Sequence, residues 1–261
     1  MPRPRVRLRP GLRVSVRSDT TLQVGLHPGH RVVLPDLPHV RALLTMLVHG
    51  VEAERLDDDQ CEPLRRLSEG GLLLDADDEV VRSRARERGR VEVVASAAVS
   101  ATVKRMLSDA GLVESRGRRS AVALVVATGA EAPRTEIDRL VQGDRPHLLV
   151  SGVAGRLRVG PFVVPGLTAC LRCVDEHLTD RDPRHPLVVE QHLDVDPTDH
   201  PRPVDLQLAL AWAVRDVVAL LEGDRPTTWS ATVDLEPDGP VTQRWRRHPR
   251  CGCAWGDALA G

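Results

Sequence analysis

Aromatic side chains are scarce in this sequence of 261 residues, which contains no tyrosine, one phenylalanine and four tryptophans. Proteins that bind single-stranded nucleic acid stack the bases on aromatic rings, so this function class is disfavoured. Lysine is equally rare, because Lys104 is the only one among the 36 basic residues and all the others are arginine. Such a skew is typical of GC-rich coding sequences, and the abundance of arginine is therefore weak evidence for phosphate binding.

Net charge and long apolar runs are also missing. The 36 basic and 37 acidic residues leave a formal net charge of −1, which creates no overall field to attract nucleic acid or an anionic membrane. No apolar run approaches the roughly 20 residues that span a bilayer. The segment Met1–Arg5 is followed by arginine alternating with valine or leucine, unlike the continuous apolar core of a secretory signal. These absences predict a soluble cytoplasmic protein with no membrane or nucleic-acid partner.

The first 80 residues predict a small domain of their own. Turn-forming residues separate short runs in which apolar and polar residues alternate, as in an antiparallel sheet. The three predicted strands are Leu12–Val16, Leu22–Leu26 and Arg31–Leu34. Apolar residues at helical spacing predict three helices, over Val40–Val48, Val51–Leu56 and Gln60–Glu69, followed by a wing strand at Leu72–Leu74. Three strands and three helices in this order are typical of a winged-helix domain, which we assign to residues 1–80.

Residues 91–261 predict an α/β domain with a parallel sheet, after an arginine-rich linker or helix end at 82–90. Apolar strands bounded by turns alternate with helices, as in a sheet covered by crossover helices. The predicted strands are Val91–Val94, Ala121–Ala127, His147–Val150 and Val159–Val164, with helices at Ser100–Ala110 and Thr135–Val141. A long helix, Val204–Leu221, whose apolar face is interrupted only by Gln207, and a hairpin around Glu236–Pro240 complete the domain.

Four of the five cysteines form two close pairs, which favours a metal site in a cytoplasmic chain, where disulfides are uncommon. The pairs are Cys170 with Cys173 and Cys251 with Cys253. Four thiolates match the ligand count of a closed, tetrahedral structural Zn²⁺ site and leave no coordination position for catalysis. Two unrelated pairs of free thiols, or a redox-active pair, are the alternatives. Cys61, in a predicted helix, is expected to be an ordinary thiol.

The sequence around the two cysteine pairs resembles that of a known family. One stretch, Val159–Pro183, reads VGPFVVPGLTACLRCVDEHLTDRDP, and the other, His248–Cys253, reads HPRCGC. Together they resemble the zinc-bearing half of ThiF-like, ubiquitin-activating-type proteins. With the segments Arg9–Gly11 and Thr20–Leu26, the chain is similar, more narrowly, to the ThiF-like leader-peptide-binding partners of YcaO cyclodehydratases in azole and thiazole peptide pathways.

The resemblance implies both a fold and a role. The fold would be an N-terminal winged-helix peptide-recognition domain followed by a degenerate, Rossmann-like ThiF-type domain with a structural zinc site. The role would be non-catalytic. The chain would capture the leader of a ribosomally made precursor peptide and present its core to a separate YcaO cyclodehydratase that forms azolines. The resemblance to ThiF-like proteins also implies a homodimer.

We expect the leader to add a strand to the exposed edge of the third predicted strand. The candidate binding residues are Arg31, Val32, Val33 and Leu34 of that strand and Leu64, Arg65 and Arg66 of the third helix. Apolar side chains of the leader would lie in the groove against this helix, and the two arginines would pair with leader acids. A purely structural interpretation is equally open, with Val32 and Leu34 as core residues and Arg65 as a solvated helix charge.

The sequence departs from catalytic ThiF-like enzymes at the nucleotide site. Those enzymes place a glycine-rich turn after their first strand, where the main chain and a helix N-terminus approach the phosphates of ATP. The corresponding stretch, Val91–Ser100, contains no glycine. The next segment, Val113–Ser120, offers no clear acidic ribose ligand, because Glu114 fits a loop charge better than a nucleotide contact. We therefore expect no ATP cofactor and no enzyme activity.

Two other functions are alternatives. An ATP-dependent ThiF-type adenylating enzyme would need nucleotide contacts that the sequence does not show. A winged-helix DNA-binding regulator finds support in the six arginines within residues 1–17. Against the regulator, Asp57–Asp59, Glu62 and Glu69 would place acidic side chains beside phosphates.

Overall fold

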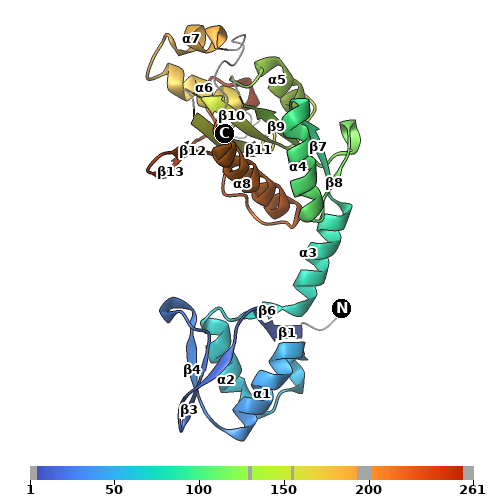
Figure 1. Cartoon of the computed structure of the whole chain (residues 1–261), viewed down its shortest axis with the longest axis vertical. Helices are drawn as coiled ribbons and strands as arrows, with labels where there is room; N and C mark the ends of the chain where they lie inside the picture. Colours follow the sequence, from blue (N-terminus) through green and yellow to red (C-terminus); the bar gives the residue numbers. More distant parts are fainter. Residues whose placement is uncertain (1–4, 129–130, 154–155, 193–200, 255–261) are drawn as a thin grey trace. The chain divides into compact units, whose positions relative to one another are not determined.

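The computed structural model of the protein describes residues 5–128, 131–153, 156–192 and 201–254 (Figure 1). The chain divides into two compact units, Met1–Ser83 and Arg84–Gly261. Helix α3 (Ala76–Arg88) contains the point of division, and residues 82–88 of the arginine-rich segment form its second half. Within the described residues, every helix is too short or too polar to cross a bilayer.

The first unit is built on two antiparallel three-stranded sheets, with strand orders β5-β1-β6 and β2-β3-β4. The strands are β1 (Arg5–Leu8), β2 (Val14–Ser18), β3 (Thr21–Val24), β4 (Val32–Pro35), β5 (Val51–Glu52) and β6 (Leu73–Asp75). The helices that precede α3 are α1 (Pro38–His49) and α2 (Asp58–Glu69). Leucine and valine side chains from both sheets and both helices form one core.

The ends of the two helices follow from their sequences. Pro38 lies in the first turn of α1, where a missing N–H breaks no helical hydrogen bond, and Gly50 ends the helix with a φ of 87° that glycine tolerates. The side chains that α1 buries are Val40, Leu43, Leu44 and Leu47. At the start of α2, Gln60 Oε1 accepts a hydrogen bond from the main-chain N–H of Asp57 (3.2 Å).

Two features of the first unit differ from the sequence prediction. The segment Val51–Leu56, predicted as a helix, forms β5 and one 3₁₀ turn, Ala53–Arg55. Six residues are too few for a stable helix, and Val51 instead pairs with Val6 of β1. Strand β1 is absent from the prediction because it is short and rich in arginine. The predicted set of three strands and three helices is therefore wrong in detail, and the winged-helix assignment stays a prediction.

The second unit is a seven-stranded mixed sheet with helices on both faces (Figure 1). Its strand order is β13-β12-β11-β10-β9-β7-β8. The strands are β7 (Arg90–Val94), β8 (Val113–Glu114), β9 (Val122–Ala127), β10 (His147–Val153), β11 (Arg156–Val163), β12 (Ala231–Glu236) and β13 (Gly239–Arg244). The helices are α4 (Ala97–Asp109), α5 (Arg134–Gln142), α6 (Leu171–Thr179), α7 (His185–Gln191) and α8 (Pro203–Leu221).

The predicted α/β architecture is confirmed for this unit, although only four of its strands are parallel. These are β8, β7, β9 and β10, whereas β11, β12 and β13 continue the sheet in antiparallel pairs. Helices α4 and α8 share a core with Phe162 on one face, and α5 and α6 pack with Val125 and Leu149 on the other. Because β7 lies between β8 and β9, the carboxyl ends of β7 and β9 mark the crevice where such folds bind ligands.

Candidate functional site

Four cysteine sulfurs from distant parts of the second unit meet at one point. Cys170 Sγ lies 3.7 Å from the sulfur of Cys173, 3.6 Å from that of Cys251 and 3.5 Å from that of Cys253. The sulfurs of Cys173 and Cys253 are 3.2 Å apart. A tetrahedral Zn²⁺ with Zn–S bonds of about 2.3 Å requires sulfurs about 3.8 Å apart. The structure thus brings together the four cysteines that the sequence analysis grouped, in nearly the geometry of such a site.

Local structure places each cysteine pair. Cys170 is the N-cap residue of α6, so it and Cys173 lie on the first turn of the same helix. The second pair follows a turn in which the N–H of Cys251 donates to the carbonyl of His248 (3.0 Å). Pro249 occupies the second position of this turn, where its fixed φ is favoured.

Burial and mutual hydrogen bonding shift the pKa values of the cysteine thiols. Cys170, Cys173 and Cys251 are buried, and Cys253 is partly buried. Hydrogen bonds from Cys170 and then from Cys173 lower the pKa of Cys253 well below its ordinary value, while the contacts of Cys170 with Cys173 and Cys253 raise the pKa of Cys170. The cluster therefore favours a thiolate at one position. Among the described residues the cluster consists of sulfur ligands alone, which fits a closed site for a thiophilic metal.

A cavity of about 320 Å³ lies beside the cysteine cluster. Residues of α5 line one side of it, and Cys170, Arg172 and Cys253 are among those that line the other. Arg172 Nε donates to Asp138 Oδ1 of α5 (2.6 Å). The cavity gives a metal ion a route to the sulfurs, as a bound metal requires.

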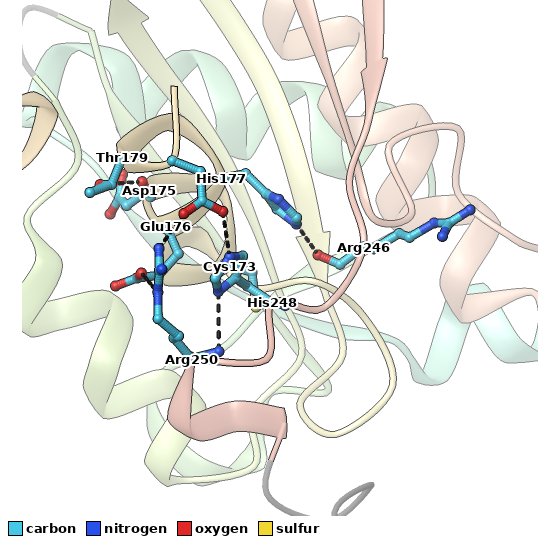
Figure 2. A network of polar contacts seen from close by, with 9 residues as sticks. Cys173, Asp175, Glu176, His177, Thr179, Arg246, His248 and Arg250 are labelled. Carbon is cyan, nitrogen blue, oxygen red and sulfur yellow. Dashed lines mark hydrogen bonds and ion pairs between the residues drawn. The ribbon is translucent and has the colours of Figure 1, made fainter. Parts of the chain in front are cut away.

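Polar side chains next to Cys173 form a network that connects α6 to the turn before the second cysteine pair (Figure 2). His248 Nε2 lies 2.9 Å from Asp180 Oδ2, and Arg250 Nε donates to Glu176 Oε2 (3.1 Å). Arg250 also pairs with Asp180. The hydrogen bonds from His248 and Arg250 hold the pKa of Asp180 below its ordinary value.

The crevice at the carboxyl ends of β7 and β9 has no glycine-rich turn between β7 and α4. Strand β7 is followed by Ala95 and by Ser96, the N-cap residue of α4. Glu114, expected in a loop, instead ends the short strand β8 and pairs with Lys104 of α4 (3.0 Å). The carboxylate of Glu114 therefore lies at the strand end where a ribose ligand is expected, but Lys104 already neutralises its charge.

Strand β4 is an edge of its sheet, because it pairs only with β3. The N–H of Asp36 donates to the carbonyl of Thr20 (2.8 Å) just beyond the two strands. Residue pairs in an antiparallel ladder alternate between bonded and non-bonded. Asp36 and Thr20 are a bonded pair, so the pairs of Leu34 with Leu22 and of Val32 with Val24 are bonded as well. The main-chain groups of Val32 and Leu34 therefore face β3, and those of Val33 face the open edge.

The open edge is short. Pro35 has no N–H, and its carbonyl accepts a hydrogen bond from the N–H of Leu37 (3.1 Å). The same alternation that turns Val33 outward also turns the main chain of Arg31 outward. A docked strand would therefore find main-chain partners at Arg31 and Val33 and none beyond Pro35.

Three of the four apolar candidate binding residues belong to the core of the first unit or pack against it, whereas Val33 is partly buried and lies outside that cluster. Leu34 is 1% exposed, and Val32 and Leu64 pack against the same core. Gly70, just after α2, lies so near β4 that a Cβ on it would come within 2.5 Å of Val32 Cγ2. These contacts place the end of α2 beside β4, as a groove between the two elements requires.

The two candidate arginines of α2 differ in their partners. Arg65 is exposed and pairs with Glu62 (2.8 Å) and Glu69 of its own helix. Arg66 is exposed too, and it has no ion-pair partner among the residues that the structure describes. Arg66 is therefore the arginine that is available to a ligand.

Comparison with known proteins finds a similar fold but no similar sequence. No family model matches the chain, and no curated protein matches it. The structure is similar to the heterocyclase TruD, with a TM-score of 0.74 and 18% identity over 96% of this chain, which spans 42% of the TruD chain. A heterocyclase solved with substrate and cofactor has a TM-score of 0.71 and 18% identity over 96% of this chain and 39% of that one.

A second similar fold is that of E. coli MccB, solved with AMPCPP and MccA. The TM-score is 0.63 and the identity 12%, over 95% of this chain and 99% of that one. At these identities the likeness is one of fold. It extends over both units, since nearly the whole chain is covered.

Proposed function

We propose that this chain is a non-catalytic scaffold that binds the leader of a ribosomally made precursor peptide and presents its core to a separate YcaO cyclodehydratase, which forms azolines. The open edge of β4 carries the proposal, because a free strand edge binds extended peptides through main-chain hydrogen bonds. The fold likeness to MccB solved with MccA, and to a heterocyclase solved with its substrate, supports a role in peptide modification. The partner enzyme is taken from the resemblance in sequence.

The leader would dock as an additional strand beside β4. The N–H and carbonyl of Val33 would form one pair of hydrogen bonds with it, and those of Arg31 the next pair. Docking would end at Pro35, which offers no donor. Main-chain contacts would thus hold only a few residues of the leader.

Side chains beside the edge would provide selectivity. Leader side chains on the α2 side would meet Leu64 and the end of the helix. Arg66, exposed and without an ion-pair partner in the described structure, suits a leader carboxylate. Arg65 would have to give up Glu62 or Glu69 before it could pair with the leader.

We assign a structural Zn²⁺ ion to Cys170, Cys173, Cys251 and Cys253. Their four sulfurs fit the ion in number, type and spacing. When bound, the ion would supply a cross-link between the start of α6 and the segment after β13, and no catalysis, because four thiolates fill its coordination sphere. The protein's own contribution is to hold the two cysteine pairs together.

An ATP-dependent adenylating enzyme is the second candidate. Two observations favour it, because MccB was solved with AMPCPP and Glu114 ends β8 at the ribose position. Against it, Ala95–Ala97 carries side chains where the main chain would have to approach phosphate. Titration calorimetry with MgATP decides between the two candidates. We expect no heat of binding. Clear micromolar binding of MgATP would contradict the scaffold function and favour the adenylating enzyme.

The strand-addition mechanism is tested with a fluorescein-labelled synthetic leader, taken from a precursor gene beside the gene of this chain, and the full-length protein. Val33→Pro should weaken binding, measured by fluorescence anisotropy, about tenfold, because it removes a donor from the open edge and leaves the bonds between β3 and β4 in place. Val33→Ala keeps the N–H and is the matched control, with binding close to that of the parent. Arg66→Glu should also weaken binding.

Equal binding by Val33→Pro and the parent, with both folded by circular dichroism, would exclude strand addition at β4. A leader that cross-links only to residues 84–261 would exclude it as well. The scaffold role has its own readout, because azoline formation by the YcaO enzyme, followed as loss of water by mass spectrometry, should require this chain. Unchanged azoline formation without the chain would contradict that role.

A further inference from the structure

We propose that His248 is a positioning residue of the metal centre, which holds the turn that carries Cys251 against the helix that carries Cys173. The inference rests on the proposed Zn²⁺ site and goes beyond it, because His248 is not one of the four ligands. Groups that hydrogen-bond to metal ligands orient them, and their loss typically reduces metal affinity.

The main chain of His248 contacts both halves of the site. Its N–H lies 3.3 Å from Cys173 Sγ, so that it can donate to the sulfur. Its carbonyl accepts the N–H of Cys251 (3.0 Å). Figure 2 shows His248 beside Cys173, with the imidazole reaching the main-chain nitrogen of Arg250. One residue therefore bridges a ligand of the first pair and a ligand of the second.

The side chain of His248 fixes this bridge. The imidazole is 5% exposed, and its Nε2 lies 2.9 Å from Asp180 Oδ2, one residue after α6. The N–H of Arg250 lies 3.2 Å from Nδ1. Because an N–H donor requires an unprotonated ring nitrogen, this contact assigns the proton of the neutral ring to Nε2, which donates to Asp180. The ring is thus an acceptor within its own turn and a donor to the end of α6.

His177, Asp180 and His248 lie close enough to be considered as a second metal site. Most of the polar atoms that these three side chains offer already have hydrogen-bond partners, however. His177 Nε2 bonds the carbonyl of Arg246 (3.0 Å), its ring packs edge-on against His248 with centroids 4.7 Å apart, and both ring nitrogens of His248 have partners. The three side chains form a hydrogen-bonded support for the cysteine site.

The test measures Zn²⁺ affinity of the full chain by competition with a chromophoric chelator. His248→Ala should weaken Zn²⁺ binding about 10- to 100-fold. His248→Asn keeps an acceptor near the position of Nδ1 and His248→Gln a donor near that of Nε2, so each should recover part of the affinity. His192→Ala is the control, because His192 Nδ1 bonds the carbonyl of Val188 in α7 (2.8 Å), away from this network. Thiolate-to-Co²⁺ charge-transfer bands report the geometry independently.

The outcomes separate this inference from the metal site itself. Affinity that falls from the parent through the Asn and Gln variants to the Ala variant supports the positioning role, and if the Ala variant does not fold, the other two carry the comparison. Parent-like affinity and Co²⁺ bands in all three variants would overturn it while leaving the four-cysteine site intact. Two metal ions per parent chain, one of them lost in His248→Ala, would make His248 a ligand and also overturn it. A parent that binds no Zn²⁺ would remove the site and the inference together.

Discussion

His147 is a histidine enclosed in the sheet of the second unit. It opens β10 between two neighbouring strands, opposite Ala123 and Val163, and is 1% exposed. Its Nδ1 lies 2.9 Å from the carbonyl of Arg145, whereas its buried Nε2 has no hydrogen-bond partner in the described structure. Burial disfavours the charged ring and lowers the pKa of His147 to about 4.

This burial predicts that mild acid destabilises the second unit. The unfolded chain protonates His147 below a pKa of 6.5 and the folded chain only near 4, so stability is full above the first value and falls as the pH drops toward the second. By pH 5 this residue alone should lower the free energy of unfolding by about 2 kcal/mol. His147→Asn does not titrate, so its urea midpoint should fall less than that of the parent between about pH 7.5 and pH 5.

The comparison of parent and variant removes the effect of acid on the cysteine ligands, which acts equally on both. Identical pH profiles for the two proteins would show that His147 is not the source of the acid sensitivity.

The role of a single residue can be predicted from the sequence when the residues that it contacts lie nearby in the chain. The close spacing within each cysteine pair indicates a metal site without any structure. His248 and Asp180, in contrast, are 68 positions apart, and no spacing rule connects them. The burial of His147 likewise results from strands that pair beside it in the folded sheet.

Arg65 shows that the local pattern can also favour a structural role. Glu62 and Glu69 stand three residues before and four residues after it, which is the spacing of ion pairs along one helix face. Both pairs are present. The spacing was therefore sufficient to favour the structural interpretation, and Arg66 remains the better candidate for a ligand contact.

At the scale of elements, a buried carboxylate connects α8 to the loop before β12. Asp216 is 0% exposed and accepts hydrogen bonds from the main-chain N–H groups of Thr227 (3.0 Å) and Thr228 (2.8 Å) and from both hydroxyl groups. The hydroxyl of Thr227 also accepts the indole N–H of Trp212 (2.7 Å). Gln207, the only polar interruption predicted for the apolar face, is exposed instead.

Replacing this carboxylate should destabilise the second unit strongly. In Asp216→Asn an amide NH₂ faces main-chain donors that cannot turn away, so we expect a loss of about 2–4 kcal/mol in the free energy of unfolding. Asp205→Asn, in the first turn of the same helix, is the matched control, because that side chain is 44% exposed and makes only a surface ion pair with Arg202 (3.6 Å); it should cost less than about 0.5 kcal/mol. Urea unfolding measures both, and similar losses for the two variants would contradict the role of Asp216.

Long elements are predictable because their burial pattern is visible within them. The apolar spacing in α1 and α8 identifies both helices. Strands β1, β5 and β8 contain only two to four residues, too few to show a period. They are strands because a neighbouring strand supplies hydrogen-bond partners, which is a property of the folded sheet.

At the scale of the whole molecule, the two units differ in their tryptophan content. The four tryptophans stand at positions 212, 229, 245 and 255, all within Arg84–Gly261. Tryptophan emission therefore follows only the unit that contains the cysteine cluster, while far-ultraviolet circular dichroism follows both units.

Cys173→Ser should abolish stoichiometric zinc in the purified protein and lower the midpoint of the tryptophan transition, since the binding energy of a structural metal is part of the folding energy. Removal of the metal from the parent by a chelator should have the same effect. Cys61→Ser is the control, because that exposed thiol lies on α2 of the first unit. An unchanged tryptophan transition and metal content in Cys173→Ser would rule out the assigned zinc site.

Cys173 and Cys251 are 78 positions apart in the chain, so a metal that joins them closes a loop containing α7, α8 and the β12–β13 hairpin. Closing a loop of this length costs the unfolded chain about 4.5 kcal/mol in conformational entropy, by the treatment used for cross-links. Cys170 and Cys173 lie on one helical turn and can bind a metal ion before the loop closes. Cys251 and Cys253 can join that ion only when the loop has closed. During refolding with Co²⁺, the four-thiolate spectrum should therefore appear only after β11 has paired with β12.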